Sequence, residues 1–104
     1  MQPLFLLPIV YALELEEGKY YIGISYDLNK RYGQHCSGYG SKWTRLYKPI
    51  DIMEVSIKES EKDMTLRYMR KYGYLNVRGA GWCKIELNSI PKPLEDELLM
   101  EKQP

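Results

Sequence analysis

The chain has 104 residues, which is enough for one small domain and no more. Hydrophobic residues make up 44% of it and charged residues 28%, ordinary values for a globular protein that exclude the disordered and fibrous classes. No apolar run approaches the roughly 20 residues that span a bilayer, so we expect no membrane-spanning segment.

The N-terminal apolar stretch, residues 4–10, is interrupted by Pro8 and has no basic residue before it, so it is not predicted to be a signal peptide. Two cysteines, Cys36 and Cys83, are too few for the disulfide framework of a small secreted domain. Together these features predict an intracellular protein, without distinguishing the nucleus from the cytoplasm.

The net charge of +1 hides two basic blocks. Residues 19–49 and 64–84 are both strongly basic, and the second block contains no acid at all. If the fold brings the two blocks together, they form a positive face suited to a polyanion such as nucleic acid. The alternative is that the charges lie on separate solvated faces.

In chain order, residues 9–15 and 19–24 are β-rich and flank the short turn at 16–18, which predicts a β-hairpin. Asp27 is a suitable N-cap for a helix that runs to about Cys36, and the segment 37–41 is expected to be a loop. Residues 50–57 alternate with a slip in period, which favours a third strand with a bulge or edge character.

A second helix is predicted to open at Ser60, with Asp63 completing a capping box, and to end at Gly73. Residues 83–87 are a candidate short strand. The expected fold class is α+β, a three-stranded antiparallel sheet flanked by helices. One domain over residues 1–90 would be followed by an acidic tail or short helix over 91–104.

Four side chains could combine for phosphodiester chemistry. The hairpin would place Tyr11 and Tyr21 side by side, and Arg31 and His35 are one helical turn apart. Arginine offers a forked donor to phosphate oxygens, and a tyrosine or histidine can take or relay the proton of an attacking water. Taken singly, each tyrosine is more simply explained as a packing residue.

Zinc is not predicted. His35, Cys36 and Cys83 could in principle bind it, but they lack the paired spacing of structural zinc sites.

The order of these residues resembles the GIY-YIG nuclease superfamily over about residues 8–80. Ile9-Val10-Tyr11 stands at the first motif, although without its glycine, and Tyr21-Ile22-Gly23 is a literal copy of the second. Residues 27–35 look like the family's helix, with its arginine and histidine in register. The segment 72–82 is similar to that of a viral and eukaryotic subgroup of small single-domain members.

The resemblance implies a metal-dependent DNA endonuclease that uses Mg²⁺ or Mn²⁺ and an attacking water. Tyr11 would be the general base, assisted by Tyr21 or His35, and Arg31 would stabilise the charge that builds on the phosphate. Gly23 would allow a close backbone approach.

One departure from the family pattern concerns the metal ligand. The position where the family has a glutamate is occupied by Thr65, and a threonine hydroxyl is a poor sole ligand for Mg²⁺. Glu61 or Asp63, on the preceding turn, could take over this role. The alternative is that both are surface acids favoured at a helix N-terminus.

Contacts with DNA are predicted from basic and polar residues of the two blocks. The set is Lys30, Lys42, Arg45, Arg67, Arg70, Asn76 and Arg78. For Arg78, which lies beside glycines, a phosphate contact and a simple tight turn are equally weighted alternatives.

Three functions remain open at this stage. The first is an endonuclease acting on DNA. The second is a catalytically degenerate scaffold that serves as a DNA-binding module, which Thr65 motivates. The third is a plain protein-interaction domain. A partner protein supplying target specificity and a homodimer are both compatible with so small a chain. The nuclease interpretation requires the Tyr11 and Tyr21 hydroxyls and the Arg31 guanidinium to converge on one solvent-filled cleft.

Overall fold

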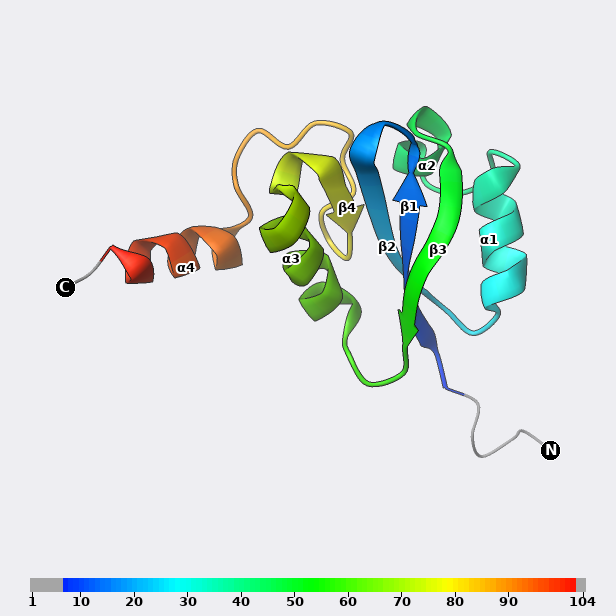
Figure 1. Ribbon diagram of the computed structural model, residues 1–104, viewed down its shortest axis with the longest axis horizontal. Helices are drawn as coiled ribbons and strands as arrows, with labels where there is room; N and C mark the ends of the chain where they lie inside the picture. Colours follow the sequence, from blue (N-terminus) through cyan, green and yellow to red (C-terminus); the bar gives the residue numbers. More distant parts are fainter. Residues whose placement is uncertain (1–6, 103–104) are drawn as a thin grey trace.

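The computed structural model describes residues 7–102, so the start of the N-terminal apolar stretch lies outside the described residues. The strands are β1 (Ile9–Leu15), β2 (Lys19–Ser25), β3 (Pro49–Ser56) and β4 (Val77–Gly79). The helices are α1 (Leu28–Cys36), α2 (Lys42–Leu46), α3 (Glu61–Tyr72) and α4 (Lys92–Glu101), with single 3₁₀ turns η1 (Glu16–Gly18) and η2 (Tyr74–Asn76). Figure 1 shows the sheet between two layers, with α1 and α2 on one side and α3 on the other.

The α+β class is confirmed, but the prediction of a three-stranded antiparallel sheet is wrong. The sheet has four strands in the order β3-β1-β2-β4, and β4 runs parallel to β2. The predicted strand at residues 83–87 is absent from the described structure. Instead the chain turns sharply after Gly79, which exchanges two backbone hydrogen bonds with Trp82 at 3.0 and 2.9 Å.

The predicted hairpin and helix starts are confirmed. β1 pairs antiparallel with β2 across η1. The Asp27 carboxylate accepts a hydrogen bond from the Lys30 N–H at the start of α1, and the Ser60 hydroxyl accepts one from the Asp63 N–H at the start of α3. Gly73 ends α3 with φ of 91°, a conformation that glycine adopts at little cost. The irregular third strand is also confirmed, because the β1–β3 register shifts twice.

Alternation along β1 and β2 divides the core between the two faces of the sheet. Val10, Ala12 and Ile22 pack with α3 and with Leu94 of α4. On the opposite face, Tyr11, Tyr21 and their neighbours pack with α1 and α2. Both candidate tyrosines therefore face the helix that carries Arg31 and His35.

Arg78 is a buried link between the sheet and α2. Its side chain is 2% exposed, and its guanidinium carbon lies 4.1 Å from the centre of the Trp43 ring. The guanidinium group donates to the backbone carbonyls of Tyr74, Leu75, Val77, Lys84 and Ile85. All three guanidinium nitrogens donate inside the protein and the residue is buried, which favours a structural role over the phosphate contact that the sequence left as an alternative.

We predict that Arg78→Met lowers the free energy of unfolding by about 2–4 kcal/mol, because the buried carbonyls lose their donor. Urea unfolding followed by circular dichroism measures the change. The matched control is Arg45→Met on the exposed surface of α2, which should change stability by less than about 0.5 kcal/mol. Equal effects of the two substitutions would contradict the assigned role of Arg78.

Candidate active site

Two tyrosines lie side by side on the sheet face that is covered by α1. Tyr11 of β1 stands opposite Gly23 of β2, and the centres of the Tyr11 and Tyr21 rings are 6.5 Å apart. A Cβ atom at Gly23 would overlap the Tyr11 hydroxyl and would lie 3.0 Å from the Tyr21 ring. Gly23 is therefore required because the Tyr11 side chain crosses over it, a more local reason than the close backbone approach expected from the sequence.

His35 of α1 connects the tyrosines to α2. Its Nε2 lies 2.8 Å from the Tyr11 hydroxyl oxygen, and its Nδ1 lies 2.9 Å from the Thr44 hydroxyl oxygen. The imidazole is 1% exposed, and the centre of its ring is 5.0 Å from that of Tyr21. Burial and the nearby Arg31 charge lower the pKa of His35 to about 4, so the ring is neutral at pH 7.

Arg31 lies one turn before His35 and is partly exposed at the edge of this cluster. Its charge lowers the pKa of Tyr11, of Tyr21 and of His35, which places the guanidinium within Coulombic range of all three. Its Nη1 donates to the side-chain carbonyl of Gln34 at 3.0 Å, which orients the group. The structure thus brings together the four residues that the sequence analysis proposed as catalytic.

The cluster is drier than expected from the sequence. Tyr11 is 1% exposed and Tyr21 is 8% exposed, so the hydroxyls do not stand in an open, water-filled cleft. Burial is the largest cause that raises the pKa of Tyr11 to about 12 and also raises that of Tyr21. The Tyr11 hydroxyl nevertheless faces polar groups, because it bonds to His35 and lies near Arg31. Tyr11 therefore belongs to the hydrophobic core on this face while its hydroxyl meets polar groups, and the solvent-filled cleft expected from the sequence is not formed.

The three candidate metal-ligand residues at the start of α3 differ in burial and in surroundings. Thr65 is fully buried, its hydroxyl donates to the Glu61 backbone carbonyl at 2.7 Å, and a Cβ at Gly79 would lie only 2.8 Å from that hydroxyl oxygen. Strand β4 thus covers Thr65 and leaves no room there for a glutamate.

Glu61, one turn earlier, is partly buried, and burial raises its pKa. Its charge contributes to the raised pKa of both Tyr11 and Tyr21, although burial is the largest cause. Asp63 is exposed, and its charge acts instead on Arg70. Of the two acids considered, Glu61 is the one whose charge acts on the tyrosines.

The predicted DNA-contacting residues fall into two groups. Lys30, Lys42 and Arg45 are exposed on the α1 and α2 side. Four others are engaged within the protein: Arg67 pairs with Glu54 and Glu59, Arg70 pairs with Glu97, Asn76 bonds Lys19 and the Tyr72 carbonyl, and Arg78 is buried.

Sequence reasoning missed two residues at the site. Thr44 is 1% exposed beneath His35, in a five-residue helix too short to show a periodic pattern. Cys83 is the second, since its thiol lies near enough to Tyr21 and Glu61 to be coupled to both electrostatically. Only the turn after β4, which was expected to be a strand, brings Cys83 there.

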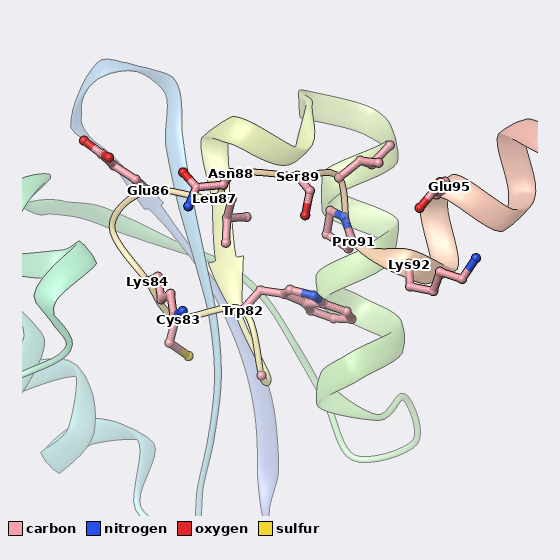
Figure 2. A pocket seen from close by; sticks show the side chains of 12 residues that line it. Trp82, Cys83, Lys84, Glu86, Leu87, Asn88, Ser89, Pro91, Lys92 and Glu95 are labelled. Atoms are coloured by element: carbon pink, nitrogen blue, oxygen red, sulfur yellow. The ribbon is translucent and has the colours of Figure 1, made fainter.

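A hollow of about 540 Å³ lies away from the tyrosines, along the segment between β4 and α4. Figure 2 shows Cys83 and Lys84 at one end of this segment and the Trp82 ring turned toward α3. Its charged lining mixes Lys84 and Lys92 with Glu86 and Glu95, so it offers no selective field for an anion. Among residues 7–102, no helix combines the length and the apolar composition that a membrane span needs.

We predict that the buried neutral His35 makes stability depend on pH. In the unfolded chain it protonates near pH 6.5, whereas in the folded protein it does so only near pH 4. Its contribution is present above pH 6.5 and is lost as the pH falls toward 4, by up to about 3 kcal/mol. Unfolding free energies of the protein and of His35→Gln, measured between pH 7 and 4, should converge toward acid. Parallel profiles would contradict the assignment.

Comparison with known proteins agrees with this arrangement. A model of the GIY-YIG catalytic domain matches residues 7–72. A UPF0213 protein from Bacillus cereus is 36% identical over 52 residues, which are 50% of this chain and 54% of that protein. One from Streptococcus pneumoniae is 41% identical over 44 residues, 42% of this chain and 44% of that protein. One from Halobacterium salinarum is 31% identical over 61 residues, 59% of this chain and 79% of that protein.

The matched region spans about half the length of the first two relatives. These relatives are bacterial and archaeal, so they do not support the viral and eukaryotic subgroup that the segment 72–82 suggested. No solved structure matches the chain at a significant level. Because the family model covers more than half of the sequence and includes the tyrosines, Arg31 and His35, the chain belongs to the GIY-YIG family.

Proposed function

We propose that this chain is a metal-dependent DNA endonuclease that hydrolyses a phosphodiester bond with an activated water. The observation that carries the proposal is the buried Tyr11–His35 hydrogen bond of 2.8 Å, with the Tyr11 hydroxyl under the electrostatic influence of Arg31 and Glu61. A proton acceptor, an anion-stabilising cation and a carboxylate at one place are the groups that phosphodiester hydrolysis needs.

Tyr11 and His35 would act as one unit. With a Tyr11 pKa of about 12 and a His35 pKa of about 4, the shared proton rests on the tyrosine. Tyr11 can therefore take a proton from water only as it passes its own proton to His35. A phosphate bound to Arg31 would offset the charge that lowers the His35 pKa, so substrate binding makes the imidazole a better proton acceptor.

Arg31 is suited to the phosphate itself. Its guanidinium sits at the partly exposed edge of the cluster, and its forked donors match phosphate oxygens. The exposed Lys30, Lys42 and Arg45 extend positive charge along the same side of the molecule and are proposed to hold the DNA backbone.

The donor set fits Mg²⁺ or Mn²⁺ bound mainly through substrate and water. Within residues 7–102 no three His, Cys, Asp or Glu side chains gather closely enough to hold a metal on their own. Mg²⁺ is commonly held by one or two carboxylates together with substrate phosphates, and Glu61 supplies one hard oxygen ligand. When bound, the ion would add positive charge beside the scissile phosphate.

A DNA-binding module without catalysis is the second candidate, and Thr65 is the observation that favours it. By the family resemblance Thr65 stands where the family has a glutamate, and the burial of Thr65 supports the loss of that ligand. The electrostatic effect of Glu61 on both tyrosines is the reason that we prefer the nuclease. We further propose that the protein works inside the cell, and that target specificity comes from DNA structure, from a partner protein or from a homodimer.

The decisive experiment compares Glu61→Gln with Asp63→Asn on supercoiled and branched DNA, with Mg²⁺, Mn²⁺ or EDTA. We expect cleavage by the unmodified protein with metal and none with EDTA. Glu61→Gln should lose about 100-fold or more in rate, the scale of one lost transition-state contact.

Asp63→Asn is the matched control and should stay within a few-fold, because that side chain faces solvent. Circular dichroism would verify that both variants fold. No cleavage by folded protein with any metal, together with salt-sensitive DNA binding, would overturn the nuclease proposal in favour of the binding module.

A further inference from the structure

Thr44 is buried in α2 and makes three polar contacts through its single hydroxyl oxygen. The oxygen lies 2.9 Å from His35 Nδ1, 3.1 Å from the Ser41 backbone carbonyl and 3.2 Å from the Ser41 hydroxyl. No buried side-chain nitrogen or oxygen in the described part of the chain lacks a hydrogen-bond partner, so this network is complete.

Counting protons fixes the direction of each bond. A threonine hydroxyl has one proton to donate and can accept two, whereas a backbone carbonyl can only accept. The contact with the Ser41 carbonyl therefore uses the Thr44 proton. With its proton used there, Thr44 accepts from His35, an arrangement that puts the imidazole proton on Nδ1.

The same count gives the protonation state of the second ring nitrogen, Nε2. A neutral imidazole with its proton on Nδ1 has a bare Nε2, which can only accept. The Tyr11 hydroxyl, 2.8 Å away, must therefore donate to it. The opposite tautomer would turn Nε2–H toward Tyr11, whose hydroxyl has no other hydrogen-bond partner among residues 7–102 to take its proton.

Gly40 seals this arrangement from the loop side. A Cβ atom at Gly40 would overlap His35 Nδ1 and would lie 2.7 Å from the Thr44 hydroxyl oxygen. The bare backbone of the loop therefore packs directly over the His35–Thr44 bond. A hollow of about 190 Å³, lined in part by His35 and Thr44, lies beside this contact, so Gly40 covers it on the loop side alone.

We infer that Thr44 is a positioning residue, which holds His35 in the Nδ1-protonated tautomer so that Nε2 can receive the Tyr11 proton. In the relay, the water gives a proton to the Tyr11 oxygen as the Tyr11 O–H bond breaks, and the original Tyr11 proton passes to Nε2, which leaves one positive charge on the imidazole. The hydroxide forms a bond to phosphorus, the bond from phosphorus to the leaving nucleoside oxygen breaks, and that oxygen takes a proton from solvent. The catalytic consequence rests on the proposed function, whereas the tautomer itself does not.

The first test is direct, because His35 is the only histidine of the chain. In protein labelled with ¹⁵N at histidine, long-range ¹H–¹⁵N NMR at pH 7 reports which ring nitrogen carries the proton. We expect a protonated Nδ1 and a bare Nε2. A spectrum with the proton on Nε2, or one that shows a mixture of tautomers, would overturn the inference whether or not the protein cuts DNA.

The second test compares Thr44→Val, which keeps the shape and removes the hydroxyl, with Thr44→Ser, which keeps the hydroxyl. Thr44→Val should shift the tautomer toward Nε2–H and lower kcat by about 10–100-fold, the usual cost of losing a group that orients a reacting side chain. The affinity for DNA should stay unchanged. Thr44→Ser should restore both the tautomer and the rate.

The outcomes separate the two proposals. If NMR shows the predicted tautomer but the protein never cuts DNA, the proposed function is wrong and the inference about Thr44 and the tautomer holds. An unchanged tautomer in folded Thr44→Val would overturn the inference even if cleavage were measured.

Discussion

The hydrogen bond between the Tyr11 hydroxyl and His35 Nε2 is the constraint around which this protein is arranged. It joins β1, an inner strand of the sheet, to the first helix through residues 24 positions apart in the chain, at 2.8 Å and with both residues buried. Two glycines stand against it because no side chain fits there, Gly23 beneath the phenol and Gly40 beside the imidazole. Such an arrangement is costly to bury and persists only where every polar atom has a partner.

The short helix α2 is held in place by contacts of Trp43 with β2 and with Arg78. Trp43 donates its indole N–H to the Tyr20 carbonyl at 2.9 Å, and the Arg78 guanidinium stacks on its ring. Arg78 stands beside Tyr21 in the β2–β4 register, so one buried cation ties the fourth strand to α2. Thr44 follows Trp43 directly, so its contact with His35 depends on that tie. A residue that the sequence suggested for DNA contact instead supports the site from within.

The parts of the fold that were predictable follow local rules. The turn at residues 16–18, the Asp27 cap and the Gly73 stop each act through neighbours a few positions away, so the hairpin, α1 and α3 could be predicted. Helix α2 has five residues and β4 has three, too few to show a period. Charge alone could not reveal that Arg78 would bond to carbonyls up to seven residues later.

The sequence was sufficient to predict which four residues meet at the site, but not how deeply they are buried or which acid lies near them. The four residues Tyr11, Tyr21, Arg31 and His35 come together because the hairpin and α1 are both encoded locally. Whether Glu61, Asp63 or Thr65 faced them depended on β4 packing over Thr65, a contact between segments that no local pattern describes. The depth of burial of Tyr11, and with it the raised pKa of its hydroxyl, likewise arises only when both layers close over the sheet.

The most direct test of the account is the position of a Mn²⁺ ion, located by its anomalous scattering in crystals grown with a short DNA duplex. The account predicts the ion on the Glu61 carboxylate, with a DNA phosphate between it and the Arg31 guanidinium and within reach of the Tyr11 hydroxyl. An ion on Asp63, or a phosphate backbone that passes the molecule without approaching Arg31, would contradict the claim that these groups form one catalytic site.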